Sequence, residues 1–235
     1  GCDYVLHGAS QLGVANPKDP NDLIVPAREG ARRAVGAAIK AGVKRVVLTS
    51  SVAATSKGDG GSDWTGDETV WTDPEFPKLN AYAQSKTLAE RAAWDLIHTS
   101  ASDTTLATVN PALVLGPVTS NDFSESVQVV ERLLTGRVPG IPRLGFNVVD
   151  VRDVADLHIR AMTDPHAAGE RFIAAANFAW MADLATLLRD RLGEAGAKVP
   201  TRKVPDFLIR LAGLFDKDLG SVTPNLGHKH DFTSE

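Results

Sequence analysis

The segment at residues 45–50 (RVVLTS) constrains the fold more than any other part of the sequence. It is a continuous apolar run without alternation, which is the pattern of a parallel strand covered on both faces. Apolar residues recur at helical spacing over residues 22–41, and Gly42 is a plausible helix stop. A second helical pattern follows at residues 80–100. This alternation of strands and helices predicts an α/β fold with a doubly wound parallel sheet.

The rest of the chain continues this alternation. Residues 55–78 are rich in Gly, Asp, Thr and Pro and predict a long loop, which in a compact domain is usually functional. The later helices are expected to form a small, mostly helical lobe over the carboxyl ends of the strands, where such sheets bind ligands. The other expected strands are residues 4–7, 105–110, 148–151 and 171–175, and the other expected helices are residues 126–135, 154–162, 181–192 and 206–215.

Tyr82 and Lys86 are the most informative residues for function. Four positions apart on a helix, they lie on one face, one turn from each other. A phenol has an ordinary pKa of about 10, and an ammonium held beside it favours the phenolate. With a Ser hydroxyl to hold a substrate oxygen, the group suits acid-base work on a carbonyl or an alcohol. The Tyr-Lys spacing alone is more typical of an exposed helix face than of a catalytic pair.

The residues around this pair resemble a known family. Residues 82–94 (YAQSKTLAERAAW) are similar to the catalytic helix of extended short-chain dehydrogenase/reductases, and most similar to the dihydroflavonol-4-reductase-like branch of the NAD-dependent epimerase/dehydratase superfamily. Further blocks match in family order and cover most of the chain. These blocks are residues 3–10 (DYVLHGAS), 26–30 (PAREG), 42–51 (GVKRVVLTSS), 110–117 (NPALVLGP) and 148–158 (VVDVRDVADLH).

The resemblance implies a Rossmann-like sheet and a set of site residues. It implies that Tyr82 donates a proton, that Lys86 lowers the pKa of Tyr82 and binds the nicotinamide ribose, and that Ser51 orients the substrate oxygen. The other residues that it places at the cofactor are Gly8, Ala9 and Ser10 under it, Ser50 facing it, Pro111 and Val114 against the nicotinamide, and Ser126 beside cofactor or substrate.

The function that the resemblance implies is an NADP(H)-dependent reductase of a ketone or aldehyde carbonyl, with NAD as a possible cofactor. The substrate would be a small-molecule carbonyl compound. A sugar-nucleotide epimerase or dehydratase is the alternative within enzymes. A regulatory protein that binds the cofactor without turnover is a second alternative, against which the intact set of Ser51, Tyr82 and Lys86 argues.

The family opens with a Gly-x-x-Gly-x-x-Gly turn that cradles the cofactor pyrophosphate, and this sequence has no such pattern. We therefore expect a chain that lacks the first β-α-β-α-β portion and a short C-terminal piece. Residues 1–117 would be the C-terminal part of the dinucleotide-binding domain. Residues 118–235 would be mostly the substrate-binding lobe, with residues 146–175 returning to the main domain.

Composition and charge exclude several classes of partner and environment for the protein. A net charge of -4 argues against nucleic acid, and no apolar run reaches the length of about 18 residues that a membrane span needs. The single cysteine, Cys2, excludes an internal disulfide and fits a reducing cytoplasm. The histidines lack metal-ligand spacing, and His228 and His230 are expected in a mobile tail. We expect a cytoplasmic monomer or homodimer without a tightly bound metal.

Overall fold

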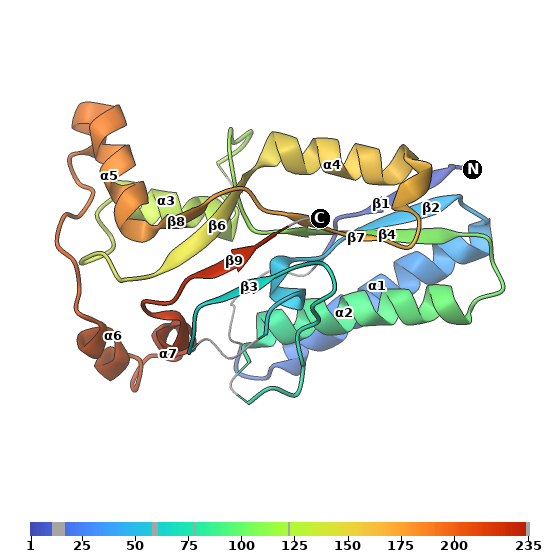
Figure 1. The fold of residues 1–235 in the computed structure, drawn as a ribbon, viewed down its shortest axis with the longest axis horizontal. Coiled ribbons are helices and arrows are strands. Elements are labelled where there is room, and N and C mark those ends of the chain that lie inside the picture. Colours follow the sequence, from blue (N-terminus) through green and yellow to red (C-terminus); the bar gives the residue numbers. More distant parts are fainter. Residues whose placement is uncertain (11–16, 58–60, 78, 122, 234–235) are drawn as a thin grey trace.

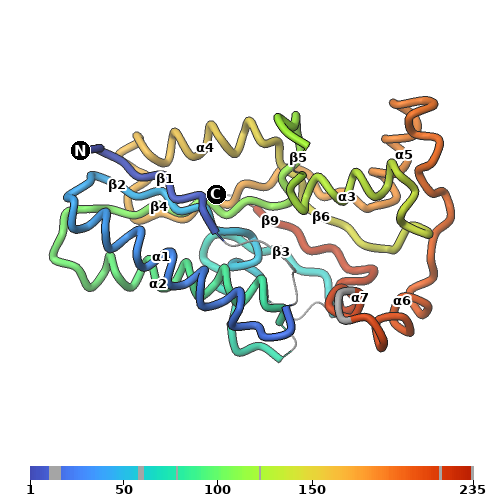
Figure 2. The backbone as a smooth tube through the Cα atoms, turned by 180° about the vertical axis from the view of Figure 1, so that it is seen from behind, coloured from blue at the N-terminus to red at the C-terminus, as the bar shows by residue number. Residues whose placement is uncertain are grey.

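The computed structural model describes residues 1–10, 17–57, 61–77, 79–121 and 123–233. Its centre is a sheet of four parallel strands flanked by helices on both faces, so the predicted doubly wound α/β fold is confirmed (Figure 1). Helices α1 (Asn21–Ala41) and α2 (Ala81–Thr99) cover one face, and α4 (Val151–Thr163) covers the other, as the view from behind also shows (Figure 2). In sheet order the strands are β1 (Tyr4–His7), β2 (Arg45–Thr49), β4 (Thr105–Pro111) and β7 (Arg171–Ala174).

Helix α1 packs through a stripe of small apolar residues. The chain leaves the helix at Gly42, whose φ of 65° is left-handed and whose N–H donates to the carbonyls of Ala38 and Ile39. Ala27 and Ala31 form a buried contact with Ala89 of α2, so the two helices approach closely. The buried residues of α1 are Leu23, Ala27, Ala31, Val35 and Ala38.

Strands β2 and β4 form the buried centre of the molecule. They pair in parallel, with Val46 opposite Leu106 and Leu48 opposite Thr108. Side chains of β2 pack toward α1 and α2 on one face and toward α4 on the other. The strand is therefore covered on both faces, as the continuous apolar run in the sequence predicts, and neither face meets water.

A lobe at the far end of the sheet has its own core. A second sheet contains the strands β5 (Leu113–Leu115), β6 (Gly145–Asp150) and β8 (Phe178–Trp180). The lobe helices are α3 (Glu125–Leu134), α5 (Met181–Leu192), α6 (Asp206–Ala212) and α7 (Lys217–Val222). Its buried core residues include Leu133, Leu144, Met181, Ile209 and Leu226.

Two expectations about irregular segments are wrong. The predicted loop at residues 55–78, of which residues 58–60 and 78 lie outside the described part, contains the strand β3 (Trp64–Gly66). The expected mobile tail forms β9 (His230–Phe232), which pairs in parallel with β3. An aromatic cluster explains why these two segments pair. Trp64 stacks on His230 at 5.2 Å between ring centroids and meets Phe232 edge-on at 5.3 Å.

The expected helix at residues 206–215 is also too long. Helix α6 ends at Ala212, because Gly213 caps it and the chain then turns into α7. Among the described residues, no helix is both long and apolar enough to cross a membrane.

Replacing Trp64 by Ala is expected to expose β9 locally. The backbone amides of residues 230–233 should then exchange hydrogen at least about tenfold faster, because the aromatic cluster that holds this short ladder is lost. Hydrogen exchange followed by mass spectrometry measures this, with the amides of β4 as the internal control. Unchanged protection of β9 would contradict the role given to the cluster.

Candidate active site

Ser51 lies where β2 leaves the sheet at its carboxyl edge. The residue begins a short 3-10 turn, Val52–Ala54, and its hydroxyl oxygen accepts from the backbone N–H of Ala53 at 3.1 Å. Its side chain is buried, with 7% of the residue exposed. The turn thus fixes the direction of the hydroxyl at the edge where parallel sheets bind ligands.

Tyr82 and Lys86 face this edge from the first two turns of α2. The helix begins at Asn80, whose side-chain oxygen accepts from the N–H of Ala83 at 2.8 Å. The Lys86 ammonium lies 6.0 Å from the centre of the Tyr82 ring. The Tyr82 phenol is within hydrogen-bonding reach of the Ser51 side chain. The structure therefore brings together the three side chains that the sequence singled out.

The environment of Tyr82 differs from the sequence expectation in one respect. Burial raises the pKa of the Tyr82 phenol, the hydrogen bond with Ser51 opposes this, and the charge of Glu125 on α3 adds to it. Lys86 does not dominate the pKa of Tyr82, because its ammonium lies over the ring and withdrawal of the phenol from water is the larger effect. Tyr82 is consequently a neutral proton donor at neutral pH.

Lys86 is a buried cation without a hydrogen-bond partner among the described residues. Burial lowers the pKa of its ammonium, and the carboxylate of Glu90, one turn further along α2, raises it. On the side of β1, burial and the charge of Lys86 lower the pKa of His7. A buried ammonium in this state is ready to donate to a ligand oxygen.

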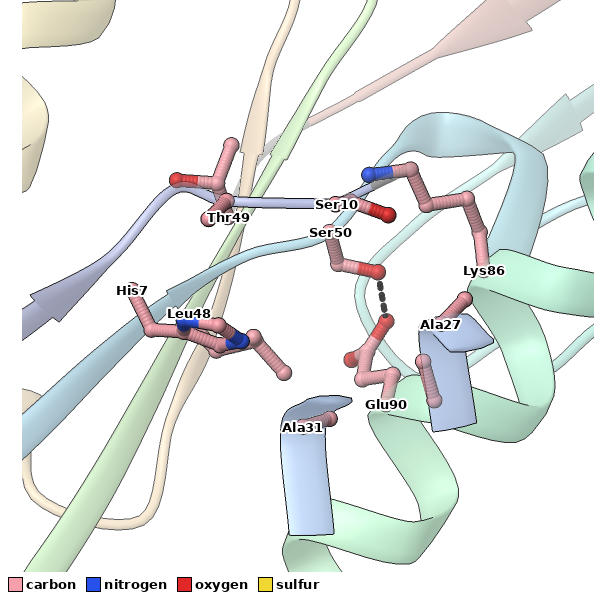
Figure 3. Close-up of a pocket in the computed structure, with 11 residues that line it drawn as sticks. His7, Ser10, Ala27, Ala31, Leu48, Thr49, Ser50, Lys86 and Glu90 are labelled. Carbon is pink, nitrogen blue, oxygen red and sulfur yellow. Dashed lines mark hydrogen bonds between the residues drawn. The ribbon is translucent and has the colours of Figure 1, made fainter. Parts of the chain in front are cut away.

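The ammonium of Lys86 points into a small open pocket between the strand ends and the two helices (Figure 3). Three alanines, Ala27, Ala31 and Ala89, line its helical side. Four of the residues predicted to bind cofactor, Ala9, Ser10, Ser50 and Lys86, line the cavity as well. The Lys86 ammonium can donate to hydroxyl oxygens and its neighbours here are small, so the chemistry of these residues fits the ribose of a nicotinamide cofactor.

The other residues predicted at the cofactor do not line this cavity. Gly8 follows β1, and a Cβ there would be 3.6 Å from the Thr49 hydroxyl. Pro111 is buried at the end of β4, where it pairs with Ala174. Val114 on β5 lines a second open cavity, of about 180 Å³, beside the N-terminus of α3. Ser126 belongs to α3 and lines neither cavity.

Glu90 is the site residue that sequence reasoning missed. It is fully buried and its carboxylate binds Ser50, the residue before Ser51. Its spacing of four from Lys86 was the available signal, since that spacing places both side chains on one helix face.

The sheet, the cavity at its carboxyl edge and the Ser51/Tyr82/Lys86 group define a class of α/β proteins with a doubly wound, Rossmann-like sheet. The chain belongs to the NAD dependent epimerase/dehydratase family, whose sequence profile matches residues 1–175. The family predicted from the sequence is thereby confirmed.

Individual relatives agree with the reductase branch. The chain is 36% identical over 191 residues to cinnamoyl-CoA reductase 1 of Petunia hybrida, covering 80% of this chain and 55% of that protein. It is 36% identical over 218 residues to an anthocyanidin reductase of Vitis vinifera, covering 86% of this chain and 62% of that protein. The chain thus spans little more than half the length of these curated relatives.

A solved structure also matches. Yeast methylglyoxal/isovaleraldehyde reductase Gre2, complexed with NADPH, superposes with a TM-score of 0.78 and 27% identity. The match covers 97% of this chain and 68% of the yeast chain. The fold described above is therefore that of a known reductase.

Proposed function

We propose that the protein reduces a ketone or aldehyde carbonyl of a small molecule with NADPH. The observation that carries this proposal is the meeting of Ser51, Tyr82 and Lys86 beside a cavity into which the Lys86 ammonium points. The relatives support it, because those named above are reductases and the yeast structure contains NADPH.

The cofactor, when bound, supplies a hydride to the carbonyl carbon. Ser51 donates a hydrogen bond to the carbonyl oxygen and so holds it next to the phenol. Tyr82, kept neutral by burial, gives its proton to that oxygen as negative charge develops there. Lys86 binds the ribose hydroxyls and provides a positive charge near the phenolate that remains.

The same proposal assigns a separate role to each of the two parts of the chain. Residues 1–117, together with α4 and β7, would hold the nicotinamide half of the cofactor. The lobe within residues 118–235 would cover the carboxyl edge of the sheet and select the substrate. A cytoplasmic location and a monomeric or homodimeric state stay predictions.

Oxidation of NADPH by the full-length protein, measured with a panel of aldehydes and ketones, tests the proposal. We expect the alcohol product to form in step with cofactor oxidation. Tight binding of NADPH without turnover of any carbonyl compound would favour the regulatory alternative instead.

Replacing Lys86 by Ala is expected to reduce both turnover and cofactor binding. Loss of the charge beside the phenolate should lower kcat about 100-fold or more, in the range of acid-base contributions. Loss of a charged hydrogen bond should weaken NADPH binding by about 10- to 100-fold. Steady-state kinetics and a fluorescence titration with NADPH measure the two effects. Lys44→Ala, at an exposed position, is the control, and unchanged cofactor affinity in Lys86→Ala would refute the ribose contact.

A further inference from the structure

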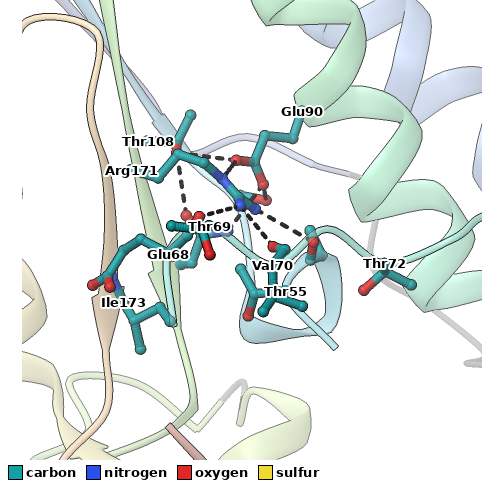
Figure 4. Close-up of polar contacts among 12 residues, drawn as sticks. Thr55, Glu68, Thr69, Val70, Thr72, Glu90, Thr108, Arg171 and Ile173 are labelled. Atoms are coloured by element: carbon teal, nitrogen blue, oxygen red, sulfur yellow. Dashed lines mark hydrogen bonds and ion pairs between the residues drawn. The ribbon is translucent and has the colours of Figure 1, made fainter. Parts of the chain in front are cut away.

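Glu90 is a carboxylate with no solvent exposure in the middle of α2. A buried charge is tolerated only when it is paired and its lone pairs are bound. One carboxylate oxygen accepts from Ser50 at 2.5 Å and from Asn110 at 2.9 Å. The other accepts from Thr108 at 3.1 Å and from Arg171 at 2.7 Å (Figure 4). The two oxygens together thus accept four hydrogen bonds.

These four partners come from three neighbouring strands. Ser50 follows β2, Thr108 and Asn110 belong to β4, and Arg171 begins β7. The side-chain amide of Asn110 also donates to the backbone carbonyl of Ser51 at 3.1 Å. One carboxylate on the helix of Tyr82 and Lys86 therefore fixes the strand end that carries Ser51.

Arg171 extends this connection to the segments that follow Ser51. One terminal nitrogen donates to the carbonyls of Glu68 at 2.6 Å and Val70 at 2.8 Å, and the other donates to the carbonyl of Ala54 at 3.3 Å. The guanidinium also stacks 3.7 Å from the centre of the Trp71 ring. The 3-10 turn that begins at Ser51 and the segment at residues 68–71 are held by the same cation.

We propose that Glu90 is a positioning residue that fixes Ser51 relative to Tyr82 and Lys86, and that its charge acts on the Lys86 ammonium from one helical turn away. The proposal rests on the reductase function proposed above. Glu90 lines the same pocket as Lys86, and in this role it acts on the reaction through Ser50, Asn110 and Lys86.

The charged groups around Lys86 decide the sign of the electrostatic effect. On its own helix, Glu90 favours the ammonium, and Tyr82 is neutral in the reactive state. On β1, His7 has a pKa lowered by burial and by Lys86, so it is uncharged at neutral pH. Arg171 contacts the Glu90 carboxylate directly. Removing the charge of Glu90 should therefore lower the pKa of Lys86 and end its positive charge at a lower pH.

Glu90→Gln in the full-length protein tests this. The amide has the size of the carboxylate but cannot accept from both Arg171 and Asn110, so we expect kcat to fall at least about tenfold with little change in the KM for NADPH. The alkaline limb of the kcat profile should move to lower pH. Asp156→Asn, at an exposed helical ion pair with Arg160, is the matched carboxylate-to-amide control and should change neither quantity.

A second readout does not depend on turnover. Carbon NMR of protein labelled at lysine Cε follows the titration of Lys86, whose signal is assigned by its absence in Lys86→Arg. We expect Lys86 to titrate at lower pH in Glu90→Gln than in the wild type. An unchanged titration, or a kcat within about threefold of wild type, each overturns the proposal. If the wild type reduces no carbonyl compound, the proposed function fails, and the Lys86 titration still decides the electrostatic role of Glu90.

Glu90→Asp covers the case in which Glu90→Gln does not fold. Aspartate keeps the negative charge, but its side chain is shorter by one methylene and cannot reach all four hydrogen-bond donors. The Lys86 titration should therefore stay close to that of the wild type, while kcat falls. Full kcat in Glu90→Asp would overturn the positioning role.

Discussion

Replacing Tyr82 by Phe is expected to lower kcat for carbonyl reduction by about 10²- to 10⁴-fold, the usual contribution of a positioned acid. The substitution removes only the hydroxyl that hydrogen-bonds with Ser51 and donates the proton. The ring, the helix and the Lys86 ammonium remain, so the Kd for NADPH should stay nearly the same. Single-turnover kinetics together with a fluorescence titration separate the two quantities.

The sequence offers a matched control for this experiment. Tyr4 on β1 is the only other tyrosine of the 235-residue sequence, and Tyr4→Phe removes the same atom away from Ser51 and Lys86. It should leave kcat unchanged. Activity of Tyr82→Phe within tenfold of the wild type would show that another group supplies the proton.

Replacing Arg171 by Met is expected to lower the free energy of unfolding by about 3–5 kcal/mol, the usual result of removing one partner of a buried ion pair. Glu90 would keep its buried charge without the 2.7 Å contact to the guanidinium, and the carbonyls of Glu68 and Val70 would lose their donor. The expected loss is therefore much larger than the few tenths of a kcal/mol of an ordinary surface substitution. Urea titration of the full-length protein measures it.

Arg160→Met is the control for this stability measurement. Arg160 pairs with Asp156 on the outside of α4, where both side chains are more than half exposed, so the midpoint of unfolding should hardly change. A small effect of Arg171→Met, similar to that of Arg160→Met, would mean that water or a rearranged side chain replaces the buried pair.

The elements of the main sheet and its helices could be predicted because their signals are local. Helix α1 has an apolar repeat and ends at Gly42, and β2 is a continuous apolar run with Lys44 before it. Each prediction needed only neighbouring residues. Helix α5 was likewise predicted with its bounds, Met181–Leu192. The three side chains of the candidate site came from the same local patterns, combined with a family resemblance.

Other features depend on residues far apart in the sequence. Strands β3 and β9 pair across more than 160 positions, with Trp64 opposite His230, and neither is long enough to be recognised alone. Glu90 looks like an ordinary surface residue of an amphipathic helix until Arg171, 81 positions away, is placed beside it. The raised pKa of Tyr82 follows from burial, which depends on the folded structure and cannot be deduced from a Tyr-Lys spacing.

The alanine contact between α1 and α2 limits which substitutions the protein can accept at these positions. The methyl groups of Ala27, Ala31 and Ala89 set the separation of the two helices and also form one wall of the cavity beside Lys86. A larger side chain at any of these positions would push the helices apart and narrow the ligand space in the same step. Helix spacing and ligand room therefore cannot be adjusted independently.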